Sequence, residues 1–103
     1  MRELLDDIRR WREDGQAVVV ATVVGTRRSA PRPVGSSFAV SQSGALCGSV
    51  SGGCVESAIV HEAEEVFETG RPKLLTYGIT DDEGWNVGLP CGGEIDVFVE
   101  KVE

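Results

Sequence analysis

Residues 17–24 read Ala-Val-Val-Val-Ala-Thr-Val-Val, an unbroken run of apolar and β-branched residues. A run of this kind is typical of a β-strand buried on both faces, because a strand with one exposed face carries polar residues at alternate positions. We therefore expect this strand to lie near the centre of a sheet, and we interpret the rest of the chain around it.

A helix is predicted ahead of this strand. Leu4, Leu5, Ile8 and Trp11 recur at helical spacing, and charged residues occupy most of the positions between them. Gly15 is well placed to end the helix. The resulting apolar stripe predicts that the helix packs on the sheet.

The chain changes character after the central strand. Over residues 25–35, Pro31 and Pro33 restrict the residues that precede them, so no regular element is expected there. Residues 36–40 and 45–50 then alternate between apolar and polar on either side of a short turn. This pattern predicts a β-hairpin.

A second helix is predicted directly after Cys54, with apolar residues on one side and acidic residues on the other. Gly70, followed by Pro72, is expected to end it. Because residues 74–77 and 94–102 read as two further strands, the element order is α-β-β-β-α-β-β. We expect a single-domain α+β fold in which a mixed sheet is packed by two helices.

Composition restricts the function classes. The chain has 103 residues, with 10 Lys and Arg against 17 Asp and Glu, which gives a formal charge of −7. An acidic domain has no broad field that attracts nucleic acid, so no nucleic-acid partner is expected. No apolar run approaches the roughly 20 residues of a membrane span, and the N-terminus does not resemble a secretory signal, so we expect a cytoplasmic protein. Three cysteines, an odd number, argue against a fully paired disulfide framework.

The first candidate site is Gly-Ser-Val-Ser-Gly-Gly-Cys-Val-Glu, residues 48–56. A strand, a glycine turn and a helix start follow one another here, and the free amides of a helix start favour a bound anion. The candidate residues for binding a cofactor are Ser51, Gly52, Gly53, Cys54 and Glu56. A thiol at the positive end of a helix has a lowered pKa, which suits either nucleophilic attack or ligation of a soft metal. The alternative is a tight turn whose Cys54 is a small core residue.

Glu56 has two readings. A carboxylate in the first turn of a helix interacts favourably with the helix dipole and can cap free amides, which is a sufficient structural role. The other reading is that Glu56 tunes Cys54.

The second candidate site is Leu-Pro-Cys-Gly-Gly-Glu, residues 89–94, which supplies Cys91, Gly92 and Gly93 as cofactor-binding candidates. The alternative is a bulge or turn into the last strand. A zinc site from the three cysteines and His61 is not expected, because the cysteine spacing is not that of a standard zinc site. A redox disulfide between Cys54 and Cys91 fits better, although the Cys-x-x-Cys arrangement is absent.

Arg32 is the third candidate. It lies between two prolines that stiffen the backbone, and a guanidinium held in this way suits recognition of a phosphate or carboxylate. The alternative is a solvated loop whose charges serve solubility, and this is the better interpretation for Arg27 and Arg28. A structural role is expected for Cys47, and an exposed, idle side chain for His61.

Taken together, Ser29-Ala30-Pro31-Arg32 with Gly35, the segment at residues 48–56 and the segment Gly88-Leu89-Pro90-Cys91-Gly92-Gly93 resemble the XdhC/CoxI family. The final Ile95-Asp96-Val97-Phe98-Val99 also fits. The resemblance covers essentially all 103 residues. Many family members continue into a C-terminal Rossmann-like domain, which we do not expect within residues 1–103.

The resemblance implies an accessory protein that binds molybdenum cofactor, protects its sulfurated form and passes it to the apoenzyme of a molybdenum hydroxylase such as xanthine dehydrogenase. It implies a transiently bound molybdopterin, with Cys54 and Cys91 as neighbours of the molybdenum. Further partners would be a separate Rossmann-like chain, a sulfurtransferase or a second copy of the chain. Two alternatives stay open: a sulfur-transfer or redox enzyme that uses Cys54 or Cys91, and a pure docking module of a two-chain maturation factor.

Overall fold

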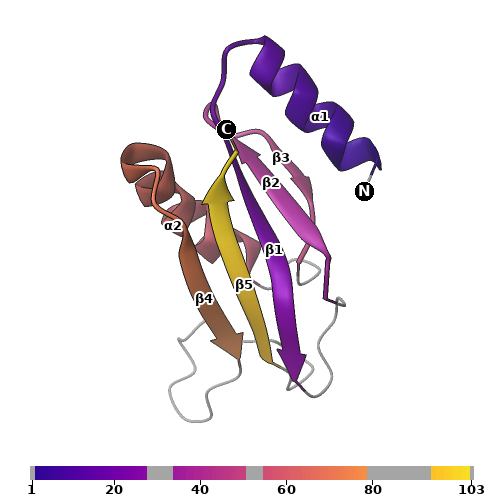
Figure 1. The fold of residues 1–103 in the computed structure, drawn as a ribbon, viewed down its shortest axis with the longest axis vertical. Helices are drawn as coiled ribbons and strands as arrows, with labels where there is room; N and C mark the ends of the chain where they lie inside the picture. The colour runs from indigo at the N-terminus through magenta and orange to yellow at the C-terminus, as the bar shows by residue number, and fades with distance from the viewer. Residues whose placement is uncertain (1, 28–33, 51–54, 79–93, 103) are drawn as a thin grey trace.

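The computed structural model describes residues 2–27, 34–50, 55–78 and 94–102. The elements follow the predicted order (Figure 1): α1 (Arg2–Glu13), β1 (Val18–Arg27), β2 (Ser37–Ser41), β3 (Leu46–Gly48), α2 (Glu56–Thr69), β4 (Lys73–Gly78) and β5 (Glu94–Lys101). The α+β fold class is therefore confirmed. No helix in these described ranges has the length and apolar character to span a membrane.

The five strands form one sheet in the order β3-β2-β1-β5-β4, so β1 is central as predicted. All the pairings are antiparallel, and the expectation of a mixed sheet was wrong. The reason is the position of the crossover. Helix α2 connects β3 with β4, and these two strands lie at opposite edges of the sheet, so they never share hydrogen bonds.

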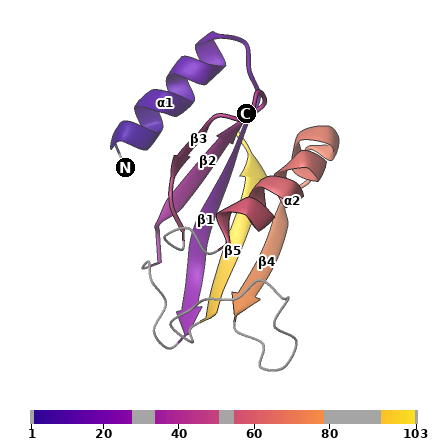
Figure 2. The same ribbon diagram turned by 180° about the vertical axis from the view of Figure 1, so that it is seen from behind.

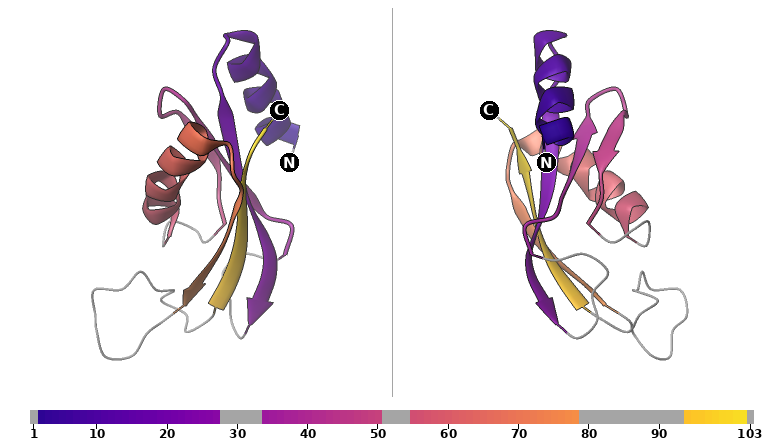
Figure 3. Two further views of the ribbon diagram at one scale, coloured as in Figure 1. Left: turned by 60° about the vertical axis from the view of Figure 1, so that its left-hand side comes forward. Right: turned by 90° about the vertical axis from the view of Figure 1, so that its right-hand side faces the viewer.

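One face of the sheet is covered by α2, which lies across it (Figure 3). Helix α2 contributes Ile59, Ala63 and Val66 to this face, and all three are fully buried. Its last turn ends at Gly70, which adopts a left-handed conformation (φ 73°) and donates its N–H to the Val66 carbonyl, as the sequence predicts. The sheet contributes alternate residues of its strands: Val19, Ala21, Val23, Phe38, Val40, Ile95, Val97 and Val99.

The opposite face is only partly covered. Helix α1 packs over β2, β3 and the start of β1, where Leu4 and Trp11 meet Val18 and Ala39 (Figure 2). Val20 packs against this cluster and is half-buried, and further along β1 Val24 is 50% exposed. Burial of β1 on both faces is thus confirmed for its first residues only, because α1, at 12 residues, covers one end of the sheet.

Strand β1 is longer than predicted. Pairing with β5 carries it through Gly25 to Arg27, where irregular structure was expected, with a bulge between Val23 and Gly25. A methyl group at Gly25 would lie 2.9 Å from Asp96 Oδ2, so glycine allows the close approach of β5. The extension was not visible in the sequence, because its hydrogen-bond partner is the distant strand β5.

Candidate functional site

The topology brings together the flanks of two predicted site segments. Arg27, the last residue of β1, pairs with Glu94, the first residue of β5, and Glu94 also pairs with Gly78 at the end of β4. The segments that carry Arg32 and Cys91 are therefore connected to the same end of the sheet (Figure 1). Helix α2 runs with its first residue toward this end (Figure 2).

Most of the predicted site residues lie outside the described part of the chain. These are Arg32, Ser51, Gly52, Gly53, Cys54, Cys91, Gly92 and Gly93. Glu56 is described, and it is the first residue of α2. The geometry of the site is therefore built from Glu56 and from the residues that flank the other segments.

The Glu56 carboxylate points back toward the strand that precedes it. Its Oε2 accepts a hydrogen bond of 2.9 Å from the Ser49 hydroxyl and another of 2.9 Å from the backbone N–H of Val50. Val50 and Val55, on either side of residues 51–54, are both fully buried. The carboxylate therefore ties the chain before this segment to the helix after it.

This contact gives Glu56 a role that the sequence did not predict. The helix begins with Val55 as its N-cap, and Val55 has no side-chain capping bond. The carboxylate of Glu56 closes the connection between β3 and α2, and its expected roles toward the helix amides and Cys54 stay predictions. Ser49 is its partner in this contact and was not among the predicted site residues, since a pair seven positions apart across a turn follows no local pattern.

Gly48 sets the path of the chain into this site. Its φ is +86°, and a methyl group on it would lie 2.4 Å from the Ser37 carbonyl oxygen. The same oxygen accepts the Ser49 N–H at 2.9 Å. Only glycine fits a left-handed backbone at this separation, so Gly48 turns the chain out of β3 and places Ser49 and Val50 within reach of Glu56.

Two other residues considered from the sequence, Cys47 and His61, are also described. Cys47 is half-buried and packs against the cluster under α1, which agrees with the structural role expected for it. His61 is exposed on α2. Within the part of the chain that the structure describes, no group of three or more His, Cys, Asp or Glu side chains could hold a metal ion.

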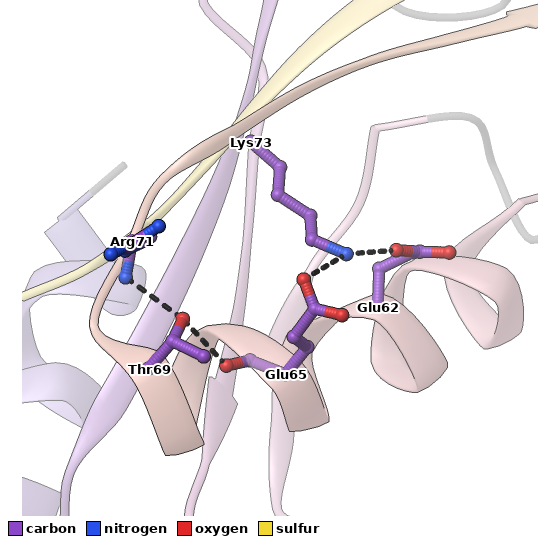
Figure 4. Close-up of polar contacts among 5 residues, drawn as sticks. All are labelled: Glu62, Glu65, Thr69, Arg71 and Lys73. Carbon is purple, nitrogen blue, oxygen red and sulfur yellow. Dashed lines mark hydrogen bonds and ion pairs between the residues drawn. The ribbon is translucent and has the colours of Figure 1, made fainter.

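A charged cluster joins α2 to β4 (Figure 4). The Lys73 ammonium lies 2.7 Å from Glu62 Oε1 and 2.8 Å from Glu65 Oε2, and hydrogen bonding to Glu62 and then Glu65 raises the pKa of Lys73. Nearby, burial and then the charge of Glu62 raise the pKa of Tyr77 to about 12. The cluster fastens β4 to the helix, and its chemistry is structural.

A groove of about 680 Å³ lies between α1 and the open face of the sheet. Leu5 and Ile8 line it from the helix, and Val20 and Val102 line it from the sheet. The groove opens on the face of the sheet opposite α2. The candidate site around Glu56 lies at the start of α2, so the groove is not part of it.

Known proteins resemble this chain over most of its length. Residues 11–78 match the XdhC and CoxI family. The chain is 40% identical over 89 residues to the molybdenum cofactor insertion chaperone PaoD of Escherichia coli (strain K12), which covers 85% of this chain and 27% of that protein. It is 33% identical over 92 residues to a probable xanthine dehydrogenase subunit of Bacillus subtilis (strain 168), covering 87% of this chain and 28% of that protein.

The fold matches the crystal structure of a xanthine dehydrogenase from Bacillus halodurans with a TM-score of 0.80 at 26% identity. The match covers 95% of this chain and 30% of the other. The chain thus spans less than a third of the length of these relatives.

Proposed function

The chain belongs to the XdhC and CoxI family, and on that premise we propose that it acts in molybdenum-cofactor maturation. In this proposal it binds the cofactor transiently and passes it to the apoenzyme of a molybdenum hydroxylase, and it performs no turnover of its own. The cofactor is cargo. The name of the 40% identical relative supports the proposal, since that protein is a molybdenum cofactor insertion chaperone.

The contact of Glu56 with Ser49 and Val50 is the observation that carries the proposal to particular residues. It ties Ser49 and Val50, which precede the predicted Gly-Gly-Cys cluster in the chain, to Glu56, which follows it. A carrier gains affinity when its binding segment is ordered before the cargo arrives, because less conformational entropy is then lost on binding. We assign Glu56 this positioning role and leave contact with the cargo to Cys54 and the glycines.

The start of α2 has the electrostatic character that such a cargo requires. The N-cap residue, Val55, supplies no side-chain capping bond, and the Glu56 carboxylate in the first turn accepts hydrogen bonds from Ser49 and Val50. Molybdopterin carries a phosphate, and a helix start of this kind favours an anion. Arg32, on the segment that follows β1, would add a second phosphate contact, and Cys54 or Cys91 would supply a soft ligand beside the molybdenum.

The proposed partners follow from the same role. The receiver is a molybdenum hydroxylase apoenzyme, because relatives of this chain carry xanthine dehydrogenase names. Further proposed partners in the delivery are a separate Rossmann-like chain and a sulfurtransferase.

The test is anaerobic equilibrium binding of molybdenum cofactor to the purified chain. We expect the wild type to retain the cofactor and Cys54→Ser, Cys91→Ser or Arg32→Ala to lose it. Glu56→Gln should bind at least about tenfold more weakly, and His61→Ala is the matched control on the exposed side of α2. Failure of the wild type to retain cofactor would overturn the stand-alone carrier and favour the docking-module alternative.

A further inference from the structure

The two edge strands of the sheet differ in how well they are protected. Strand β3 is three residues long, ends at the left-handed Gly48, and is covered by α1, which leaves Cys47 half-buried. Short length, a twisted end and a covering helix are the usual means of blocking an edge. Strand β3 is therefore a poor template for another strand.

Among the described residues, strand β4 lacks these protections. It has six residues and pairs with β5 on one side, and none of the described strands pairs with its other side. It contains no proline and no bulge, and Leu74 is 65% exposed. A regular edge of this length presents a row of backbone donors and acceptors to another chain.

The one charge on β4 does not guard the edge. Lysine on an edge strand normally discourages pairing. Lys73, however, extends over α2, where its ammonium is held between Glu62 and Glu65 (Figure 4). The charge is paired with two carboxylates of the same molecule, and the other five residues of the strand are uncharged.

We propose that β4 pairs antiparallel with β4 of a second copy, which would join the two sheets across a two-fold axis. Alternate residues share a face, so a register centred on Leu75 sets Leu74 opposite the partner's Thr76 and Lys73 opposite the partner's Tyr77. Lys73 is the only charged residue in the strand, so no like charges oppose one another. This self-complementarity favours a second copy over a foreign strand.

The pairing would also extend an apolar surface. Leu74 is the neighbour of Phe98 in the sheet, on the face that α1 leaves open. In the dimer, Leu74 and its counterpart would lie on the same face, two positions from each other across the new strand pair. The dimer would therefore bury Leu74, which is the most exposed large hydrophobic side chain of the described residues.

Analytical ultracentrifugation of the full chain over a wide concentration range tests the proposal. We expect a concentration-dependent monomer–dimer equilibrium for the wild type and at least a tenfold weaker association for Leu74→Lys. Leu46→Lys is the matched control, because Leu46 is 54% exposed on the other edge strand and should leave the equilibrium unchanged. Circular dichroism of each variant checks that it is folded, and Thr76→Lys replaces Leu74→Lys if that variant does not fold.

Thr22→Lys separates edge pairing from contact between the open sheet faces. Thr22 lies on the open face beside Phe98, away from the β4 edge, so edge pairing should survive the change. Three outcomes would overturn the proposal: a wild type that stays monomeric at millimolar concentration, undiminished association of Leu74→Lys, or a loss of dimer with Thr22→Lys equal to that with Leu74→Lys.

Discussion

The two faces of the sheet differ in how they are covered. On the α2 face, Val97 and Val99 of β5 are fully buried beneath Ile59 and Val66 of the helix. On the α1 face, Phe98 of the same strand is half-buried, and Leu74 beside it is mostly exposed. One face of these strands is therefore buried in the core, and the other face is partly exposed to solvent. We therefore expect most of the stability of the domain to come from the apolar layer between α2 and the sheet.

The largest expected effect is on that layer. Ile59→Ala would remove a fully buried side chain from the centre of the α2 face and should lower the free energy of unfolding by about 2–5 kcal/mol. Phe98→Ala, a larger truncation on the open face, should cost less. Urea denaturation of both variants measures the contrast. An equal loss would show that the open face contributes as much as the core.

The next largest loss of stability is expected from a side chain at Gly48, the last residue of β3. A methyl group there would approach the Ser37 carbonyl oxygen at 2.4 Å and Leu4 Cδ1 at 3.3 Å. Gly48→Ala should therefore cost about 2–3 kcal/mol, of which left-handed strain alone supplies about 1 kcal/mol.

Gly44→Ala is the control for strain without a clash. Gly44 has φ +96° and nothing within 4 Å of the added methyl group. The difference between the two variants in urea denaturation isolates the clash at Gly48. If both variants lose the same stability, the clash with the Ser37 carbonyl oxygen is not what excludes a side chain at position 48.

A smaller effect is expected at Glu56, which joins β3 to the start of α2. Glu56→Gln keeps the shape but weakens the hydrogen bonds that the carboxylate accepts from Ser49 and Val50, and should cost about 1–2 kcal/mol. Glu64→Gln, an exposed position on the same helix, should be nearly neutral. Thermal unfolding at neutral pH compares them, and equal midpoints would refute the tie between β3 and α2.

The smallest effect is a loss of stability at alkaline pH. The pKa of Tyr77 is raised to about 12 in the folded protein, so between pH 10 and 12 the unfolded chain loses this proton while the folded chain keeps it. The contribution of Tyr77 to stability should therefore be constant below pH 10 and fall as pH rises toward 12. The loss is about 1 kcal/mol once solvent screening of this half-buried group is allowed for. The raised pKa of Lys73 acts in the same direction above its ordinary value of 10.5.

Tyr77→Phe checks the contribution of the phenol. Its denaturation midpoint should fall less steeply between pH 10 and 12 than that of the wild type, and the residual slope reports the other groups that titrate there, Lys73 among them. Identical slopes for the two proteins would show that the surroundings of Tyr77 do not hold its proton.

Local patterns in the sequence predicted the helices and strands. The spacing of Leu4, Ile8 and Trp11 predicted α1, Gly70 predicted the end of α2, and the apolar run at 17–24 predicted the central strand. The resemblance to the XdhC/CoxI family was confirmed by the family match and by the similar proteins. These features depend on residues close together in the chain or on motifs read directly from it.

Within the candidate site, the sequence singled out Glu56 and the glycine cluster but missed Ser49. The contact between Glu56 and Ser49 forms only after the chain leaves β3 and turns into α2. Cys54, Cys91 and Arg32 stay predictions, to be tested by the binding experiment.

By itself, the sequence determined the family, the order of elements and the apolar faces, because periodicity and turn chemistry act over a few residues. Knowledge of the tertiary structure was needed for the antiparallel pairing of the described strands, the extension of β1 to Arg27, two hydrogen-bond partners of Glu56 and the place of β4 at the edge of those strands. Each of these depends on which distant segment lies alongside, and that choice is set by how the whole chain buries its apolar faces at once.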